Sequence, residues 1–243
     1  VFFSATLLPM PYYKHLLGDG EDYAVYARSP FAAKNRLLLL GQDVSSRYTR
    51  RNQTEYGRIA AWLAAMAEGR RGNYLAFFPS YRMMGEVFDI FEERYGKRVD
   101  CVIQRSGMRE EEREAFLRQF ELGGIFSEGI DLKREALIGA AVVGTGLPQV
   151  CHEREILRRY YEERGMDGFA YAYRYPGMNK VLQAAGRVIR TDEDRGVILL
   201  LDDRFLSSEY RRLFPLEWEG LQACRLGDAG GRMESFWEGA GQA

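Results

Sequence analysis

Short apolar runs alternate along this chain with segments of helical periodicity, and this alternation limits the possible folds more than any other feature. Five runs bounded by Gly, Asn, Asp or Pro are typical of buried strands, and they cover residues 36–40, 73–78, 99–103, 137–144 and 196–201. Helical patterns cover residues 56–68, 83–95, 109–121, 153–164 and 179–190. Strands separated by helices predict the α/β class, with a parallel sheet covered by helices on both faces.

The composition excludes several classes of protein. The chain has 243 residues, 46% hydrophobic and 28% charged, which suits one large or two small globular domains. A net charge of −1 gives no global support to nucleic-acid binding, so such a function must rest on local patches. No apolar run approaches the roughly 18 residues of a membrane span.

The three cysteines, Cys101, Cys151 and Cys224, lie far apart without Cys-x-x-Cys spacing. A disulfide framework, a zinc site or an iron–sulfur cluster within this chain is therefore not expected, and we predict a reducing, cytoplasmic location. The chain begins inside a strand-like segment, without Met, so we expect it to be part of a longer protein.

One side of the predicted helix over residues 179–190 carries a distinctive polar set. Gln183, Gly186, Arg187 and Arg190 have the spacing i, i+3, i+4, i+7, and the other side is apolar. Glycine inside a helix costs roughly 1 kcal/mol relative to alanine, so Gly186 indicates that a ligand approaches closely. Two guanidinium groups beside a glutamine suit a phosphate whose charge grows in a transition state. A solvated helix face is the alternative, and the shared side of the helix argues against it.

Four segments in chain order resemble helicase motifs. Ser-Ala-Thr at 4–6 resembles motif III, Phe-Phe-Pro-Ser-Tyr at 77–81 motif IV, Ser-Glu-Gly-Ile-Asp at 127–131 motif V, and Gln-x-x-Gly-Arg-x-x-Arg at 183–190 motif VI. Together they resemble the second motor lobe of superfamily 2 helicases of the DinG/XPD branch, over about residues 1–204. The resemblance implies a RecA-like parallel sheet of the P-loop NTPase fold, and ATP-driven movement along single-stranded DNA with duplex unwinding, usually 5′→3′.

The resemblance also implies roles for single residues. Arg187 and Arg190 would be arginine fingers that meet the γ-phosphate, with Gln183 beside them. The implied nucleotide-binding residues are Glu128, Gly129, Asp131 and Gly186. The implied DNA-binding residues are Ser80, Tyr81 and Ser127.

The chain lacks half of such a site. Its only Gly-Lys pair, Gly96-Lys97, is followed by Arg98, so there is no phosphate-cradling Gly-x-x-x-x-Gly-Lys-Ser/Thr loop, and no Asp-Glu magnesium box is present. ATP and Mg²⁺ would therefore be bound mainly by the N-terminal lobe of the same protein, which is the expected partner besides single-stranded DNA. We assign no metal ligand in this chain, and we expect the isolated chain not to hydrolyse ATP.

We expect three regions: residues 1–30 with motif III and the inter-lobe connection, 31–226 as the RecA-like lobe, and 227–243 as a flexible Gly-rich tail. Between Phe120 and Ile125 the family has a strand that this sequence lacks. Either the lobe has lost that strand or residues are missing from the sequence. Missing residues are favoured, because losing the strand would expose a long unpaired edge.

Some patterns allow two interpretations. Arginines and tyrosines alternate over residues 153–175, which could follow a single strand of DNA or form an amphipathic helix with Glu–Arg pairs and tyrosines packed on the sheet; the acidic residues favour the second. Residues 45–51 could hold phosphates or form a polar connection. Asp202 and Asp203 more often cap a turn than bind a metal, and His15 and His152 receive no role. A non-catalytic binding module of the same fold and an RNA-directed helicase lobe remain alternatives.

Overall fold

The computed structural model describes residues 1–4, 6–18, 21–104, 107, 109, 111, 125–126 and 137–239. Within them, one parallel sheet has the strand order β3-β2-β4-β5-β1-β6. Its strands are β1 Arg36–Gly41, β2 Tyr74–Phe77, β3 Ile125–Phe126, β4 Gly139–Val143, β5 Gly196–Leu201 and β6 Gln222–Cys224. The predicted α/β class, with helices on both faces of a parallel sheet, is confirmed.

The central strands are apolar along their whole length because both of their faces are covered. Every residue of β4 and β5 is buried, and β1 pairs with β5 in the register Leu38↔Ile198. A strand that is buried on both sides gains from apolar side chains at every position, rather than at every second one. This explains why these strands could be recognised as continuous apolar runs.

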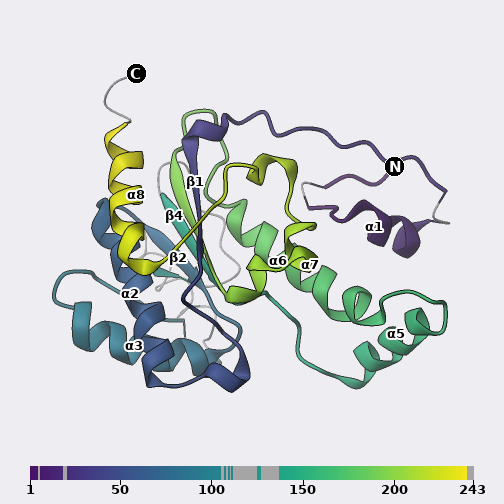
Figure 1. Cartoon of the computed structure of the whole chain (residues 1–243), viewed down its shortest axis with the longest axis horizontal. Coiled ribbons are helices and arrows are strands. Elements are labelled where there is room, and N and C mark those ends of the chain that lie inside the picture. Colours follow the sequence, from purple (N-terminus) through teal and green to yellow (C-terminus); the bar gives the residue numbers. More distant parts are fainter. Residues whose placement is uncertain are drawn as a thin grey trace.

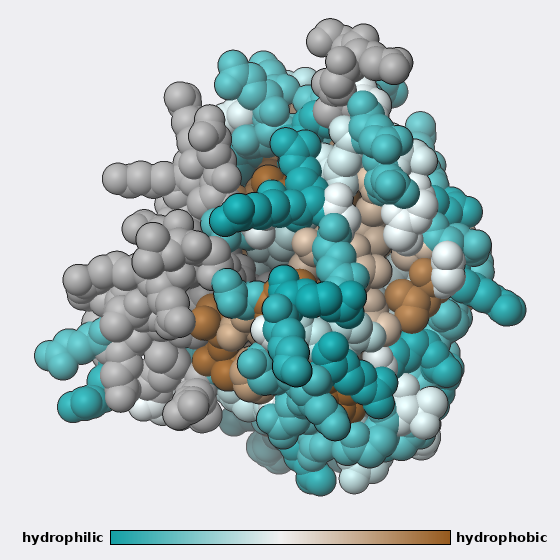
Figure 2. All heavy atoms as spheres, turned by 90° about the vertical axis from the view of Figure 1, so that its left-hand side faces the viewer, coloured by the Kyte–Doolittle hydropathy of each residue, from teal (hydrophilic) through white to brown (hydrophobic). Residues whose placement is uncertain are grey.

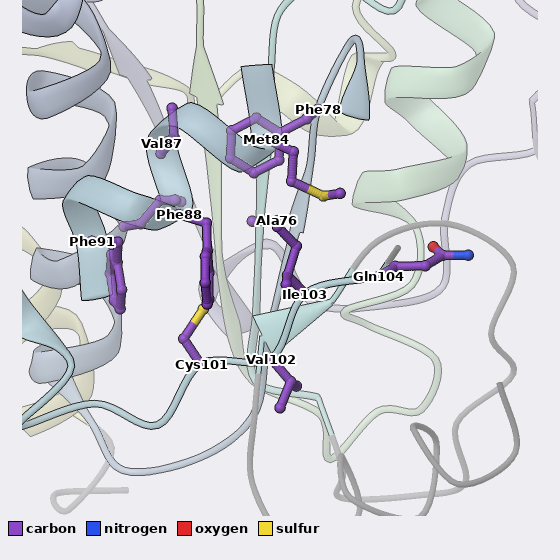
Figure 3. Close-up of a pocket in the computed structure, with 11 residues that line it drawn as sticks. Ala76, Phe78, Met84, Val87, Phe88, Phe91, Cys101, Val102, Ile103 and Gln104 are labelled. Atoms are coloured by element: carbon purple, nitrogen blue, oxygen red, sulfur yellow. The ribbon is translucent and has the colours of Figure 1, made fainter. Parts of the chain in front are cut away.

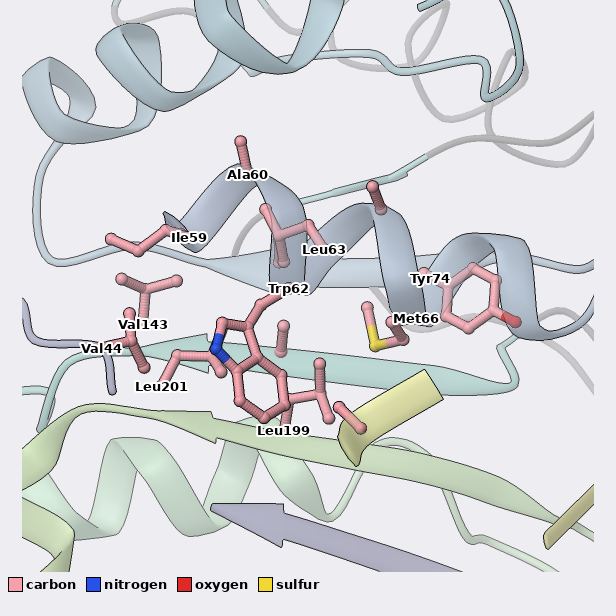
Figure 4. Packing of buried hydrophobic residues seen from close by; sticks show 14 of the residues in the cluster. Val44, Ile59, Ala60, Trp62, Leu63, Met66, Tyr74, Val143, Leu199 and Leu201 are labelled. Carbon is pink, nitrogen blue, oxygen red and sulfur yellow. The ribbon is translucent and has the colours of Figure 1, made fainter. Parts of the chain in front are cut away.

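Helices α2 (Gln53–Gly69), α3 (Tyr81–Tyr95) and α8 (Leu226–Glu238) cover one face of the sheet (Figure 1). The Trp62 side chain of α2 is fully buried at the centre of this layer, beside Leu199 and Leu201 of β5 (Figure 4). The outer surface over these helices is mostly hydrophilic (Figure 2), as expected for amphipathic helices that turn one side inward.

Helix α6 (Tyr175–Ala185) covers the other face, together with the short helix α7 (Ser208–Arg211) (Figure 1). Val181 and Leu182 of α6 pack against Leu200 of β5 in this second core. Short 3-10 helices cover Ala33–Asn35, Tyr48–Arg50, Asp203–Leu206 and Leu216–Trp218.

A third, aromatic cluster lies beside the second core. Helix α1 (Met10–Leu17) packs here against α5 (His152–Glu162) and a turn of π-helix at Ala170–Arg174. Its buried rings are Tyr12, Tyr161 and Tyr171, and the Tyr161 and Tyr171 rings stack with centroids 4.1 Å apart. The N-terminal segment is therefore attached to the α5–α6 region by packing.

The strand predicted at residues 99–103 is wrong, since this segment does not join the sheet. Val99 and Cys101 pack against the α2 core and Val102 against the α6 core. The apolar run is thus explained by partial burial without a hydrogen-bonded ladder. Burial raises the pKa of the Cys101 thiol to about 12.

The flexible tail predicted from residue 227 is also wrong as far as residue 238. Helix α8 occupies this stretch, and its Ala229, Met233 and Trp237 side chains are buried against the core that contains α2. Residues 240–243 lie outside the described part of the chain.

Two further predictions concern residues that the structure does not describe. Of the helix expected at 109–121, the structure describes only residues 109 and 111. Residues 121–124, where the family has an additional strand, also lie outside the described part of the chain. Residues 125–126 form β3, which pairs with Tyr74 and Leu75 of β2. Among the described helices, none is long and apolar enough to cross a membrane.

Candidate functional site

The segment from Gln183 to Arg190 divides into an open polar side and a buried apolar side, as predicted. Gln183, Gly186 and Arg190 are exposed and Arg187 is half-buried. The residues between them are buried: Val181, Leu182, Ala184, Ala185, Val188 and Ile189. The guanidinium-bearing side therefore faces away from the sheet core.

The predicted helix at 179–190 is placed too late in the chain, because α6 begins at Tyr175 and ends at Ala185. Arg187 N–H donates to the Ala184 carbonyl at 3.4 Å and Val188 N–H to the Ala185 carbonyl at 3.3 Å, which tightens the last turn. Beyond it, the Asp194 carboxylate accepts the N–H groups of Arg190 and Thr191, each at 2.7 Å. A local side-chain acceptor thus replaces the helical carbonyl, and Arg190 stands in a loop.

Gly186 is open on its outer side. Its φ of −67° is accessible to any residue, so the backbone does not require glycine. Among the described residues, a Cβ placed there would meet only the carbonyl oxygens of Leu182 and Gln183, at 3.2 and 3.8 Å. No side chain of another described element covers this position, which agrees with the close approach that the sequence indicated.

Asn179 connects the N-terminal motif to this region, one helical turn before Gln183. Its amide nitrogen donates to the Thr6 carbonyl at 3.0 Å and the Leu8 carbonyl at 2.8 Å, and its oxygen accepts from the Tyr13 hydroxyl at 2.6 Å. Asn179 is only 8% exposed, so these bonds satisfy a buried amide. The structure thereby brings the segment around Ser4 and Thr6 together with the polar side of α6.

The arginine segment lies at the amino-terminal ends of the strands, whereas the segment at 77–81 lies at their carboxyl-terminal ends. Arg190 precedes β5, whose first residue Gly196 lies against the Val188 side chain, and the Asn35 side chain just before β1 donates to the Asp192 carbonyl at 2.8 Å. Ser80, in contrast, follows the carboxyl end of β2. The sequence predicted both groups but not their separation.

Ser80 and Tyr81 stand at the amino end of α3. The Ser80 hydroxyl accepts the Met83 N–H at 3.2 Å, and Tyr81 is 51% exposed. The amino end of a helix attracts anions through its unpaired N–H groups and its dipole. This geometry suits a phosphate without any recognition of base sequence.

A buried network that the sequence did not predict joins the ends of β1 and β5. Asp202, which is fully buried, accepts the Ser46 N–H at 2.8 Å, the Ser46 hydroxyl at 2.6 Å and the Arg204 Nε–H at 2.7 Å. Burial alone would raise the pKa of Asp202, but the Arg204 guanidinium and the Ser46 hydroxyl outweigh it, and the pKa lies below its usual value. The Asp202 carboxylate also accepts the Arg204 N–H at 3.0 Å, so the capping interpretation is confirmed for Asp202. The Asp203 carboxylate pairs instead with Arg47 and Arg50.

Residues 152–175 contain the Glu–Arg pairs of the amphipathic-helix interpretation, which the acidic residues of the segment had favoured. The Arg158 guanidinium pairs with Glu155 and Glu162, at 3.0 and 2.7 Å, and Arg154 donates to the Ala172 carbonyl.

The buried Tyr161 and Tyr171 rings contact Tyr12 of α1 and one another, and the buried Tyr173 donates its hydroxyl to Glu155. Of the tyrosines in this described segment, only the half-buried Tyr175 packs against the core that contains the sheet. Packing therefore explains the buried tyrosines and the paired Arg154 and Arg158 of this segment, whereas Arg159, Tyr160 and Arg164 are exposed.

The implied nucleotide-binding residues Glu128, Gly129 and Asp131 and the implied DNA-binding residue Ser127 lie outside the described residues. Within the described ranges, no three His, Cys, Asp or Glu side chains come together as a metal site.

An apolar cavity of about 30 Å³ lies between β2, α3 and the segment at 101–104 (Figure 3). It is lined by Phe78, Met84, Phe88 and Cys101, among others. Its volume is about the share of one water molecule, so it is far too small for a nucleotide.

Several known proteins resemble this chain in sequence and in fold. The family described as Helicase C-terminal domain matches residues 63–220. A probable ATP-dependent helicase of Methanocaldococcus jannaschii is 27% identical over 215 residues, 79% of this chain and 32% of that protein. The ATP-dependent DNA helicase XPD of Sulfolobus acidocaldarius is 26% identical over 178 residues, 71% of this chain and 32% of that protein.

A solved structure of XPD in its apo form superposes with a TM-score of 0.62 at 21% identity, over 79% of this chain and 40% of that chain. Its fold is shared with this chain. The chain spans about a third of the length of the two curated relatives, 32% in each case.

Proposed function

Because the chain belongs to the helicase C-terminal domain family, as a lobe of the DinG/XPD type, we propose that it supplies arginine fingers to ATP hydrolysis in a complete DNA helicase. The observation that carries this proposal is the outward-facing set of Gln183, Gly186, Arg187 and Arg190 on a buried apolar base. The first lobe of the complete protein supplies the phosphate cradle and the Mg²⁺ ligands.

The chemistry asked of this lobe is electrostatic. In phosphoryl transfer, negative charge spreads over the oxygens of the transferred group, and fixed guanidinium groups stabilise it. Arg187 and Arg190 come from a helix end and from a loop that Asp194 holds through two 2.7 Å bonds. Gln183 presents an amide on the same side, and Gly186 leaves room for the phosphates.

In this proposal, the nucleic acid is bound at the carboxyl-terminal ends of the strands. Ser80 and Tyr81 at the amino end of α3 hold a backbone phosphate of single-stranded DNA. Ser127 belongs to the same track, and Glu128, Gly129 and Asp131 to the nucleotide side, on the basis of their motif alone. Movement is in the 5′→3′ sense by the same resemblance.

Asn179 gives these two functions a physical connection. The carbonyl groups of Thr6 and Leu8 are hydrogen-bonded to the Asn179 amide, beside Gln183. Thr6 belongs to the segment that resembles motif III, which in the resembled family links hydrolysis to strand movement. A shift of the first lobe relative to α6 would therefore act directly on this buried amide.

The test uses the complete protein that contains this chain. We expect Arg187→Ala and Arg190→Ala each to lower single-stranded-DNA-stimulated ATP hydrolysis by about 10³-fold or more, the scale on which arginine fingers act. Arg211→Ala, which removes an exposed arginine from α7, is the control and should hydrolyse ATP at the wild-type rate. Near-wild-type hydrolysis in both finger variants would refute the assignment.

The main alternative is a non-catalytic binding module, which is compatible with the absence of a phosphate-cradling loop from this sequence. Such a module binds single strands tightly by itself and is indifferent to nucleotide. The helicase proposal predicts weak, salt-sensitive binding by the isolated chain, which strengthens when the first lobe is present.

A further inference from the structure

Positive charge and an open aromatic ring gather in the loop after β1, residues 45–51, which the proposed function does not use. The loop contains Arg47, Arg50 and Arg51 and no acidic residue. Between them Tyr48 is 84% exposed. A ring so open contributes little to packing, so the stability of the fold does not explain a tyrosine here.

The base of this loop is firmly held. Ser46 is 2% exposed and gives both its N–H and its hydroxyl to Asp202. Ser45 is fully buried, and its hydroxyl donates to Asp203 at 2.9 Å. Because the two serines are fixed, the short helix Tyr48–Arg50 presents the tyrosine from a rigid support, and little ordering is needed when a ligand binds.

Three arginines flank the tyrosine in the chain, and the Arg51 guanidinium lies near its ring. Arg51 donates to the Ser46 carbonyl at 3.1 Å, and its guanidinium carbon lies 5.6 Å from the centre of the Tyr48 ring. Arg47 and Arg50 share the Asp203 carboxylate at 3.1 and 3.4 Å, and their side chains remain 49% and 42% exposed. A guanidinium has five N–H donors, so these ion pairs leave donor capacity at the surface.

The loop lies beside the segment proposed to hold DNA. A Cβ placed on Gly144, at the end of β4, would lie 2.6 Å from the Ser46 hydroxyl oxygen and 3.7 Å from Cγ of Pro79. Gly144 has a φ of +87° and therefore both the conformation and the space that suit glycine. Ser46 of the β1 loop and Pro79, which precedes Ser80 and Tyr81, therefore both lie close to Gly144.

We propose that the loop at 45–51 is a further contact for single-stranded DNA, in which the Tyr48 ring stacks on a base and Arg47 and Arg51 hold the neighbouring phosphates. An aromatic ring stacks on any base and arginines follow the backbone, so the contact is independent of sequence. The inference rests on the proposed helicase function and extends its track from the end of β2 to the end of β1.

The experiment measures the binding of a fluorescein-labelled oligo(dT) to the complete protein by anisotropy. Tyr48→Ala weakens binding about tenfold, whereas Tyr48→Trp stays within about twofold of wild type because stacking is retained. Tyr23→Ala removes a tyrosine that is equally open, 104% exposed, and serves as the matched control with unchanged affinity. In an Arg47→Ala/Arg51→Ala double variant, the slope of log Kd against log salt falls by about 0.7 for each lost phosphate contact.

Three outcomes would overturn the inference. If Tyr48→Ala binds oligo(dT) as the wild type does, the loop is a polar connection only. If Tyr48→Ala and Tyr48→Trp weaken binding equally, the ring does not stack. If the wild-type protein does not bind oligo(dT) at all, the proposed function fails together with this inference, and ATP hydrolysis by the Arg187→Ala variant reports on the finger assignment separately.

Discussion

At the carboxyl-terminal ends of the strands, the side chain of Asp202 shows how one buried charge can organise several loops. Asp202 has no exposed surface, yet it accepts hydrogen bonds from both Ser46 and Arg204. A buried ion is unfavourable unless such partners compensate for its lost hydration. The network therefore fixes the starts of two loops relative to each other, including the loop that presents Tyr48.

Removing the Asp202 charge should destabilise the fold in a pH-dependent way. Asp202→Asn leaves the Arg204 guanidinium without its carboxylate, and we expect a loss of about 3–5 kcal/mol in the free energy of unfolding at pH 7. Because the folded-state pKa of Asp202 lies below the usual 3.8, the contribution is fully present above that value and is lost as the pH falls through the folded-state pKa. Urea unfolding of the wild type and of Asp202→Asn, at pH 7 and at pH 3, measures this loss in the free energy of unfolding and its change with pH.

Asp203→Asn is the control for this prediction, since its side chain is 25% exposed and its ion pairs face solvent. It should lose only about 0–1 kcal/mol. Equal losses in the two variants, or a loss in Asp202→Asn that does not shrink at low pH, would show that the buried carboxylate has no special role.

At the scale of helices and strands, α8 shows the limits of composition as a guide. Its glycines led us to expect a tail, yet the three glycines at 227, 230 and 231 are exposed. The apolar positions Ala229, Met233 and Trp237 recur at i, i+4 and i+8 on the buried side. The helical period was present in the sequence, and it outweighs the low helix propensity of glycine because tertiary packing stabilises the helix.

The packing of α8 should contribute measurably to stability. Trp237 is 8% exposed and its ring lies 4.6 Å from the Arg70 guanidinium. We expect Trp237→Ala to lower the free energy of unfolding by about 3–5 kcal/mol, measured by chemical denaturation. Glu238→Ala, at an exposed position of the same helix, should change it by less than about 0.5 kcal/mol. A frayed C-terminal segment would instead tolerate both substitutions.

Helix and strand positions could be predicted where a pattern depends on local burial. The strands β4 and β5, and β1 after Arg36, are apolar because both faces are covered. Helices α2 and α3 lie where their periodicity placed them. The run at 99–103 has the composition of a strand but is only partly buried and joins no strand of the sheet, because pairing depends on the neighbouring strand and not on the run itself. The end of α6 was missed because Asp194 competes for the backbone N–H groups beyond it.

For the candidate site, the sequence predicted the outward direction of Gln183, Gly186 and Arg190 but not the contacts between distant segments. The bonds from Asn179 to Thr6 and Leu8 join parts of the chain that only the folded structure brings together. The Ser46–Asp202–Arg204 network is similar, although an Asp-Asp-Arg sequence at a strand end was the signal available for it. Side chains that act within one element can be predicted, whereas tertiary partners cannot.

At the scale of the whole molecule, the proposed function assigns the two ends of the sheet to different partners. The arginine segment lies at the amino-terminal ends of the strands, and Ser80, Tyr81 and the β1 loop lie at their carboxyl-terminal ends. A nucleotide and a DNA strand can therefore be bound at the same time without competing for side chains. In the proposed function, the lobe contributes to both sites, and each arginine finger needs a phosphate held by another lobe.

ATP hydrolysis by the isolated chain and by the complete protein, measured side by side with saturating oligo(dT), tests this account most directly. We predict that residues 1–243 alone hydrolyse no ATP above background, and that the complete protein hydrolyses it in a reaction that Arg190→Ala abolishes. Hydrolysis by the isolated chain, or a complete protein that is indifferent to Arg190, would contradict the claim that this lobe forms one wall of a shared nucleotide site.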